Sequence, residues 1–506
     1  MPRRGDVESS ATLGAAAAAG WAYLAEGGAH LVLERRDVAD DDPNVAGRVL
    51  RLRKTKTEPS SFGEDVARDD ARDDALEPRS NALTDDSLWA SHPGFENARS
   101  AEDRSWAFAH NVMRPLLGDR FVDPGAFAPV DHAFLRAVAD AVEPARPRAR
   151  CALSRIDPAA TRAALAPDAR RVDRVRVGAE DGGAAAGAAA GAAADWFSVE
   201  IKPKCGFALP GDPESTSRFA MHQALRVRSG EVRRASAYDP LDLFAGCDEF
   251  ATNSRESTIR ESTTRRVRAL RALADAPRNN LRVARRGFRW PSVATTRLDS
   301  DSESSSSDSL DAFVSRTDGP ANLNPESFRL GGAARLLDLV NDALAASGVL
   351  AALLRAQRRD TIGAEAAAAL YESLSSDVVS DVRRQTSDDR MKKMLRDFVV
   401  AAVAKDCSVL VAFRGERDDD DDDDNDDGTF AVAAGPCHAE GGTLPRVRYR
   451  CRVSVVDVDL KPIANITKWL ATHRRIARNW ATEKRAARSD AQPGESDDDS
   501  ISRRNP

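Results

Sequence analysis

Apolar and polar residues alternate in the first part of the chain, on both sides of a glycine turn. The alternation runs over 21–33, with Gly27 and Gly28 at the turn, and resumes over 48–53. A repeat of two residues is typical of β-strands that bury one face. The pattern predicts a hairpin followed by a third strand, which together begin a small β-rich lobe.

Further along the chain, apolar residues recur every three or four positions, which predicts helices. These helices cover 106–117, 132–142, 217–227, 264–273, 333–354 and 391–400, and a basic helix covers about 463–487. Strands are expected at 196–199, 407–413 and 447–455. The chain has 506 residues, more than one compact core usually holds, so we expect two lobes of mixed α/β (α+β) class.

Several stretches interrupt this periodicity. Residues from about 55 to 100 are charged, and we interpret them as a flexible insertion. Low-complexity loops are expected at 183–194, 299–308 and 418–427, and a disordered tail at 491–506. The resulting division places a first, nucleotide-binding lobe at 1–170 and a second lobe, for substrate and catalysis, at 171–490.

Charge and composition exclude several classes of protein. The 74 basic and 80 acidic residues give a formal net charge of -6, which argues against bulk nucleic-acid binding. No apolar run approaches the roughly 20 residues of a membrane span, and the first residues make a poor signal peptide. We therefore expect a soluble protein of the cytoplasm, the nucleus or both, with no membrane partner. Six cysteines without paired spacing predict reduced thiols.

Two lysines carry the most informative chemistry. Residues 200–210 read Glu-Ile-Lys-Pro-Lys-Cys-Gly-Phe-Ala-Leu-Pro, which separates Lys202 from Lys204 by a single proline at a strand end. Alternation along a strand would send both side chains to one face, where two positive charges repel unless an anion joins them. The run therefore predicts an anion-binding site.

Six further segments accompany this run in a fixed order, at 26–33, 218–223, 238–244, 278–280, 404–408 and 457–462. Together they resemble the inositol-pentakisphosphate 2-kinase family. Its members transfer the γ-phosphate of ATP to the 2-hydroxyl of an inositol ring that already carries five phosphates. The resemblance implies a two-lobed kinase-like fold, ATP and Mg²⁺ as cofactors, and a monomer. It also implies inositol pentakisphosphate as substrate and inositol hexakisphosphate (phytate) as product.

The resemblance assigns roles in the first lobe one residue at a time. The glycine-rich loop over the nucleotide would be formed by Glu26, Gly27, Gly28 and His30, although the family usually has asparagine at the last of these positions. Arg51 matches an arginine that binds nucleotide phosphates. Arg150 matches an arginine that binds substrate phosphates, and Asp168 falls near the hinge that holds adenosine.

The same resemblance assigns the second lobe. The residues matched to substrate contacts are Lys202, Lys204, His222, Arg226, Asn279, Asn280 and Lys461, and Arg282 is matched to the nucleotide. His222 and Arg226 are four residues apart, on one helical face.

Three aspartates complete the assignment. Asp406 resembles the catalytic residue that accepts the hydroxyl proton, with Lys204 beside it in catalysis. Asp457 resembles the ligand of the nucleotide's magnesium, and Asp459 is expected to assist with the metal. We expect the lysines, His222 and the aspartates to surround one shared cavity.

The chain also departs from the plant members it resembles. Asn465 and Trp469 stand where an arginine and a tyrosine contact substrate phosphates, and Lys468 or Arg474 could compensate for them. Plant members carry a Cys-x-x-Cys zinc element, but the matching stretch near 374–377 has no cysteine. We therefore expect no zinc.

Three alternative functions stay open. One is an inositol polyphosphate kinase of relaxed specificity, suggested by Asn465 and Trp469. Another is a catalytically silent scaffold that binds inositol phosphates, although a pure binder has no need for Asp406 and Asp457. Nucleic-acid binding rests only on arginine pairs such as 265–266 and 474–475, and neither the net charge nor the sparse aromatics support it.

We predict that deleting the acidic loop 418–427 leaves turnover nearly unchanged, because a run of like charges repels itself and stays solvated. Steady-state turnover of the deletion variant tests this, with Asp406→Asn as the inactive reference. A deletion variant as inactive as that reference would contradict our interpretation of the loop.

Overall fold

The structure is a computed structural model, and it describes most of the chain outside the low-complexity stretches. The described residues are 12–35, 45, 47–57, 83–172, 196–209, 216–247, 256–285, 288–291, 309–315, 332–376, 382–415, 428–434, 437–439, 442–444 and 447–490. The predicted loops 183–194, 299–308 and 418–427 and the tail 491–506 therefore lie outside the described residues.

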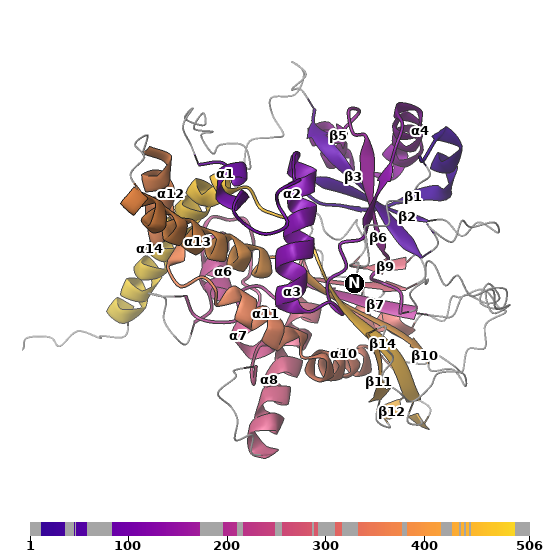
Figure 1. The fold of residues 1–506 in the computed structure, drawn as a ribbon. Coiled ribbons are helices and arrows are strands. Elements are labelled where there is room, and N and C mark those ends of the chain that lie inside the picture. The colour runs from indigo at the N-terminus through magenta and orange to yellow at the C-terminus, as the bar shows by residue number, and fades with distance from the viewer. Residues whose placement is uncertain are drawn as a thin grey trace, which may run out of the picture.

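A smaller antiparallel sheet forms the upper right part of the molecule in Figure 1. Its strand order is β1-β2-β3-β6-β4, and β5 pairs with β3. The strands are β1 (Trp21–Glu26), β2 (His30–Arg35), β3 (Arg48–Lys56), β4 (Ala126–Pro129), β5 (Ser154–Ile156) and β6 (Arg162–Pro167). The hairpin and third strand predicted from the alternation are confirmed.

The central strands β2 and β3 present one apolar face and one mixed face. The register aligns Leu31 with Leu52 and Leu33 with Leu50, and all four side chains are buried. They pack with helix α4 (His132–Val142), whose apolar side lies in the same core. Because neighbouring residues point to opposite faces, His30 and Arg51 lie on the other face, away from α4.

A larger antiparallel sheet forms the second lobe, with strand order β11-β14-β10-β7-β8-β9. Its strands are β7 (Trp196–Ile201), β8 (Leu281–Arg285), β9 (Phe288–Trp290), β10 (Ser408–Gly415), β11 (Thr429–Ala434) and β14 (Val447–Val456). A separate two-stranded sheet pairs β12 (Cys437–Ala439) with β13 (Gly442–Leu444). The mixed composition with two separate sheets confirms the predicted α+β class.

Helices cover one face of the larger sheet, to its left in Figure 1. The α-helices other than α4 are α1 (Asp85–Trp89), α2 (Ala101–Phe108), α3 (Arg114–Leu117), α5 (Arg148–Leu153), α6 (Arg218–Arg228), α7 (Pro240–Leu243), α8 (Glu256–Asp275), α9 (Leu310–Ser315), α10 (Ala333–Ser347), α11 (Val349–Gln357), α12 (Gly363–Ser376), α13 (Val382–Ala404) and α14 (Ile466–Asp490). A π-helical turn (Ala109–Met113) joins α2 to α3. Short 3-10 helices are η1 (Ala15–Gly20), η3 (Glu143–Ala145) and η6 (Ile463–Asn465).

Two predicted segments differ from the structure. The helix expected over 333–354 is two helices, because Gly348 adopts a left-handed conformation with φ of +70° and ends α10. The flexible insertion expected over about 55–100 is wrong for its second half. There, α1 buries Leu88 and Trp89 in the larger core, and its capping box starts at Thr84.

The segment 83–122 packs with the larger sheet, although it precedes the last strands of the smaller one. Its buried side chains, among them Trp89, Phe108 and Met113, belong to the larger core. The sequence divided the chain at residue 170, whereas the packing assigns 83–122 to the second lobe. The chain returns to the smaller sheet through Gly125, whose φ is +71° and where an added Cβ would lie 2.3 Å from the carbonyl oxygen of Leu165.

Within the described ranges, no single helix is long and apolar enough to span a membrane. One bent pair, α10 with α11, meets the criteria of length and composition together, at an angle of 66°. The five cysteines 151, 205, 247, 407 and 451 form no disulfide with one another, as expected for reduced thiols.

A buried ion triad fixes the end of β1 to the rest of the smaller lobe. The Oε2 atom of Glu26 accepts hydrogen bonds from Lys54 Nζ at 2.7 Å and from Arg146 at 2.9 Å. All three side chains are almost fully buried. Burial alone would raise the pKa of Glu26, but the hydrogen bonds from Arg146 and Lys54 outweigh it, and the pKa lies below its ordinary value.

We predict that Glu26→Gln lowers the free energy of unfolding by about 3 kcal/mol, because it leaves buried Lys54 without its counter-charge and buried Arg146 with only the half-exposed Glu143. Urea unfolding at neutral pH measures the change. The matched control is Glu143→Gln, whose half-exposed carboxylate also bonds Arg146, at 3.0 Å, and should cost less than about 1 kcal/mol. Equal costs for the two variants would contradict the importance of burial.

Candidate active site

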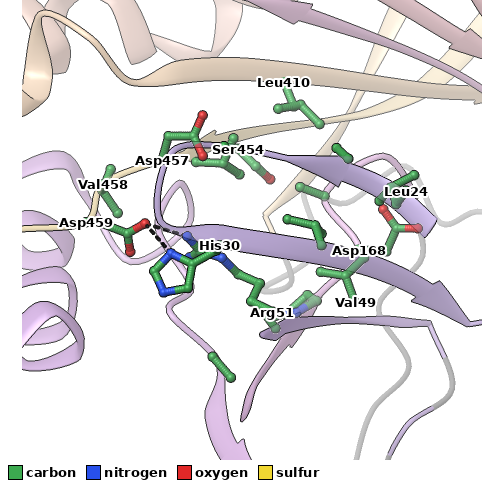
Figure 2. A pocket seen from close by; sticks show the side chains of 18 of the residues that line it. Leu24, His30, Val49, Arg51, Asp168, Leu410, Ser454, Asp457, Val458 and Asp459 are labelled. Carbon is green, nitrogen blue, oxygen red and sulfur yellow. Dashed lines mark hydrogen bonds and ion pairs between the residues drawn. The ribbon is translucent and has the colours of Figure 1, made fainter. Parts of the chain in front are cut away.

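A cavity of about 460 Å³ lies between the two sheets. The mixed face of the smaller sheet forms its roof with residues such as Val32, Val49 and Arg51. Its floor is the polar face of the larger sheet, where the register aligns Glu200 with Leu410 and Leu410 with Ser454. Figure 2 shows side chains from both sheets pointing into this space.

The cavity collects many of the residues assigned from the sequence. Those that line it are Glu26, Gly27, His30, Arg51, Arg150, Asp168, Lys202, Asn279, Arg282, Asp457 and Asp459. The assigned residues outside its lining are Gly28, Lys204, His222, Arg226, Asn280, Asp406 and Lys461. The expectation of a single shared cavity is therefore met only in part. The contacts of the second group place several of its members in a cluster beside the cavity.

An ion pair between Arg51 and Asp459 joins the roof of the cavity to the segment after β14, as Figure 2 shows. Burial alone would raise the pKa of Asp459, but Arg51 outweighs it, so the pKa is lowered and the carboxylate is charged. Ser105 on α2 supports the same segment, because its hydroxyl accepts from the backbone N–H of Leu460 at 3.2 Å.

His30 lies 3.6 Å from Asp459, yet it is a neutral neighbour of the pair at neutral pH. Burial, and after it the charge of Arg51, lower the pKa of His30 to about 4, although Asp459 acts in the opposite direction. The imidazole can therefore offer one donor and one acceptor to a ligand, but no positive charge.

The backbone of Asp457 has a conformation that is rare for residues other than glycine. Its φ is +60°, in the left-handed region, and its half-exposed carboxylate lies 3.4 Å from Lys202 Nζ. Residues in sparsely populated conformations concentrate at functional sites, where the surrounding structure holds them. The two segments that form this pair are the end of β14 and the end of β7, so the pair closes one edge of the cavity floor.

A second cluster adjoins this edge. Asp406 lies between two lysines, with Oδ1 3.4 Å from Lys204 and Oδ2 2.5 Å from Lys461. Burial would raise the pKa of Asp406, but Lys461 and Lys204 outweigh it and the pKa is lowered. Lys202 acts in the same direction, which links the cluster to the cavity. Burial also lowers the pKa of Lys204.

His222 and Arg226 extend this cluster along α6. Burial, and then Arg226, lower the pKa of His222, and Arg475 and Lys204 contribute to the same shift. The guanidinium of Arg226 is engaged by Glu231, at 2.6 Å. His222 therefore lies within electrostatic reach of Lys204.

The segment 202–206, which we call the lysine loop, is anchored from below. Lys204 has a φ of +62°, and the hydroxyl of buried Tyr238 donates to the carbonyl oxygen of Pro203 at 2.7 Å. An added Cβ on Gly206 would lie 2.4 Å from the ring of Phe244. Both aromatic residues belong to the segment 238–244, so that motif supports the lysine loop.

Other assigned residues are committed to partners. The carboxylate of Glu26 is occupied by the buried triad, and Asp168 forms a bidentate pair with Arg170, at 2.8 and 2.6 Å. Arg282 lies 3.6 Å from Glu200. The backbone carbonyl oxygen of buried Asn280 accepts from the backbone N–H of Lys202 at 2.9 Å, whereas the side-chain Oδ1 of Asn280 has no hydrogen-bond partner among the described residues.

The residues that depart from the plant pattern also have structural partners. Trp469 packs against Phe398, with ring centroids 5.8 Å apart. Arg474 forms a bidentate pair with Glu365, at 2.8 and 2.6 Å, on the exposed surface. The guanidinium of Arg474 is thus held by α12.

Several residues of the site carried no signal that we used. Helix α2 lines the cavity with Glu102, Ser105 and Trp106, and the π-helical turn after it adds Ala109; their spacing of three and four residues marks one helical face. The sequence predicts a helix only over 106–117 and assigns none of these residues to the site. Arg162 and Arg289 also line the cavity, from β6 and β9. In the part of the chain that the structure describes, no three His, Cys, Asp or Glu side chains gather as a metal-binding group.

Comparison with known proteins identifies a family. Residues 23–475 match the family inositol-pentakisphosphate 2-kinase. A protein of Arabidopsis thaliana named inositol-pentakisphosphate 2-kinase is 28% identical, covering 95% of this chain and 97% of its own length. Proteins of the same name from Oryza sativa subsp. indica and Cryptococcus neoformans are each 25% identical. They cover 90% and 92% of this chain, and 92% and 94% of their own lengths.

We predict that Lys204→Gly is more stable than Lys204→Ala by about 1 kcal/mol, because only glycine adopts a left-handed conformation without steric cost. Urea unfolding of both variants gives the difference. Gly230→Ala serves as the control, because Gly230 has a φ of +74° and open space around it, and it should lose a similar amount. Equal stability of the two Lys204 variants would show that the lysine loop relaxes.

Proposed function

The chain belongs to the inositol-pentakisphosphate 2-kinase family, and on that premise we propose its reaction. It transfers the γ-phosphate of ATP to the 2-hydroxyl of inositol 1,3,4,5,6-pentakisphosphate and produces inositol hexakisphosphate. The structural observation that carries this proposal is Asp406 between Lys204 and Lys461, beside a cavity that both lobes line.

The substrate brings a large negative charge. At about 1.5 to 2 charges per phosphate, five phosphates carry roughly eight to ten. Lys202, Lys204 and Lys461 are the cations that would meet them first, because all three converge on the edge between β7 and β14. On α6 beside them lie His222, whose lowered pKa leaves it neutral, and Arg226, which is paired with Glu231. Arg150 and Asn279 line the cavity.

Asp406 is proposed as the base that accepts the proton of the 2-hydroxyl. Its two lysines hold its pKa below the ordinary value, which makes it a weak base in the free protein. Phosphates that take up Lys204 and Lys461 would weaken that effect and raise the pKa, so the carboxylate becomes more basic when substrate is bound. Phosphoryl transfer needs this positioning and charge neutralisation more than covalent help.

Arg51, His30 and the glycine turn are proposed to hold the nucleotide at the roof of the cavity. Asp457 and Asp459 are the carboxylates that would hold Mg²⁺, which in such sites binds one or two carboxylates together with substrate phosphates. The donor set fits this ion, since both carboxylates border the cavity and offer hard oxygen ligands, which Mg²⁺ would share with or take over from Lys202 and Arg51. Bound Mg²⁺ would neutralise the charge of the nucleotide phosphates.

The alternative of relaxed specificity has one structural observation in its favour. Trp469 is packed on Phe398, and the guanidinium of Arg474 is held by Glu365. With its guanidinium held by Glu365, Arg474 does not replace the phosphate contacts that Asn465 and Trp469 lack by comparison with plant members. The substrate would then be held more weakly on the side of α14, which would allow inositols with fewer phosphates to compete.

We predict that purified full-length protein with ATP, Mg²⁺ and inositol pentakisphosphate forms product phosphorylated at position 2, and that Asp406→Asn lowers kcat by about 10² to 10⁴-fold. Product regiochemistry is determined by NMR. Asp397→Asn is the matched control, because Asp397 also lies between two cations, Arg359 and Lys393, but belongs to α13 and has no assigned role in the site.

The results of this assay distinguish the proposed reaction from its two alternatives. Transfer to another hydroxyl, or equal turnover of less phosphorylated inositols, would favour relaxed specificity. Tight binding without any transfer would favour a silent scaffold. An Asp406→Asn variant as active as Asp397→Asn would remove Asp406 from the proposed catalytic role.

A further inference from the structure

Gln357, the last residue of α11, is fully buried, and its side-chain amide bonds three backbone groups. Its Nε2 donates to the carbonyl oxygens of Lys204 at 2.8 Å and Ala404 at 3.1 Å. Its Oε1 accepts from the backbone N–H of Gly206 at 2.8 Å. Both amide hydrogens and the carbonyl oxygen are used, so the group is fully satisfied.

The three backbone groups belong to two segments that carry the proposed chemistry. Lys204 and Gly206 are in the lysine loop, and Ala404 ends α13, two residues before Asp406. The carbonyl of Lys204 and the N–H of Gly206 lie outside strands and helices, so a side chain supplies what a sheet would otherwise supply. One amide thus spans the gap between the lysine loop and the turn that presents Asp406.

The left-handed conformation of Lys204 explains why such a bond is needed. A φ of +62° is costly for a lysine and persists only where neighbouring bonds hold the backbone. Tyr238 fixes the carbonyl just before this residue, and Gln357 fixes the carbonyl of the residue itself. Without the second bond, the peptide after Lys204 can rotate, and the ammonium group moves with it.

We propose that Gln357 is a positioning residue for phosphoryl transfer, an inference that rests on the proposed function. It sets the distance between Lys204 and Asp406 before substrate binds, now 3.4 Å, by tying both backbone segments to a single planar amide. Gln357 touches neither substrate nor nucleotide, and it acts through the two residues that it holds in register.

The chemistry of an amide predicts how replacements behave. Methionine fills a similar volume but supplies no hydrogen bond, so Gln357→Met releases all three backbone groups. In Gln357→Glu, an ionised carboxylate would face two carbonyl oxygens, whereas the protonated acid can donate to one of them and still accept from Gly206. The nearby charged groups are already paired, as Lys204 with Asp406, Lys405 with Asp360, and Arg359 with Asp397.

The experiment compares the full-length wild type with Gln357→Met and Gln357→Glu over pH 5 to 9, measuring kcat and the KM values for ATP and inositol pentakisphosphate. We expect Gln357→Met to lose about 10²-fold in kcat at every pH, with the KM for ATP within about twofold. For Gln357→Glu, the ratio of its kcat to the wild-type kcat should rise as pH falls, because burial raises the pKa of the introduced carboxyl.

The matched control is Asn341→Leu in α10. Asn341 is also a buried amide, bonded to Arg266 at 3.1 Å and Asp342 at 3.0 Å, but it lies away from the lysine loop. This variant should lose stability with wild-type kcat for its folded fraction, which circular dichroism and thermal unfolding measure for every variant. Should Gln357→Met fail to fold, the pH dependence of Gln357→Glu decides alone.

A Gln357→Met variant with kcat within twofold of wild type would overturn the proposal. A ratio for Gln357→Glu that stays flat with pH would also overturn it. Wild-type turnover tests the proposed function separately. If the wild type forms no product, calorimetric binding of inositol pentakisphosphate replaces kcat, and wild-type affinity in Gln357→Met would reject the positioning role.

Discussion

The site depends on mutual neutralisation between cations and carboxylates of the same chain. The pairs are Arg51 with Asp459, Lys202 with Asp457, and Lys204 and Lys461 with Asp406. Without them, lysines so close together would repel one another and raise the free energy of the folded protein. The same pairs lower the pKa values of Asp406 and Asp459, which keeps both carboxylates charged. A polyanionic substrate therefore replaces the carboxylates as the partner of these cations. The free protein does not have to hold unpaired lysines close together while it waits for the substrate.

Backbone strain is concentrated where these pairs meet. Lys204 and Asp457 are two of the three non-glycine residues with positive φ in the part of the chain described by the structure. Each follows a strand of the larger sheet, so the turn out of the strand redirects the side chain toward the edge of the cavity. The anchoring by Tyr238 and the packing of Gly206 on Phe244 show what such a turn requires below it. The motif at 200–210 supplies the charge, and the motif at 238–244, which is separate in sequence, holds it in place.

The sequence predicted what depends on periodicity and on local motifs. Alternation placed β1, β2 and β14, and three-to-four spacing placed α4 and α6 almost to the residue. Features that arise from long-range packing were not predictable in this way. Gln357 and Ser105 lie just outside the predicted helices 333–354 and 106–117, and their role is not visible locally, because the lysine loop and Leu460 that they bond lie more than a hundred residues away. Glu26 was assigned to the nucleotide, since nothing near it in sequence indicates that Lys54 and Arg146 occupy its carboxylate.

The crossing at Gly125 has a mechanical consequence. The chain passes from the larger core, which it leaves at Val122, to β4, which begins at Ala126, in a few residues. The indole N–H of Trp106 donates to the carbonyl oxygen of Gly125 at 3.1 Å. The carbonyl oxygen of Leu165 leaves no room for a side chain at position 125. The link between the two lobes is therefore short and tightly held at this point. It limits how far the two lobes can separate beside Gly125, so we expect an opening that admits ligands to be widest at the rim of the cleft farthest from this residue.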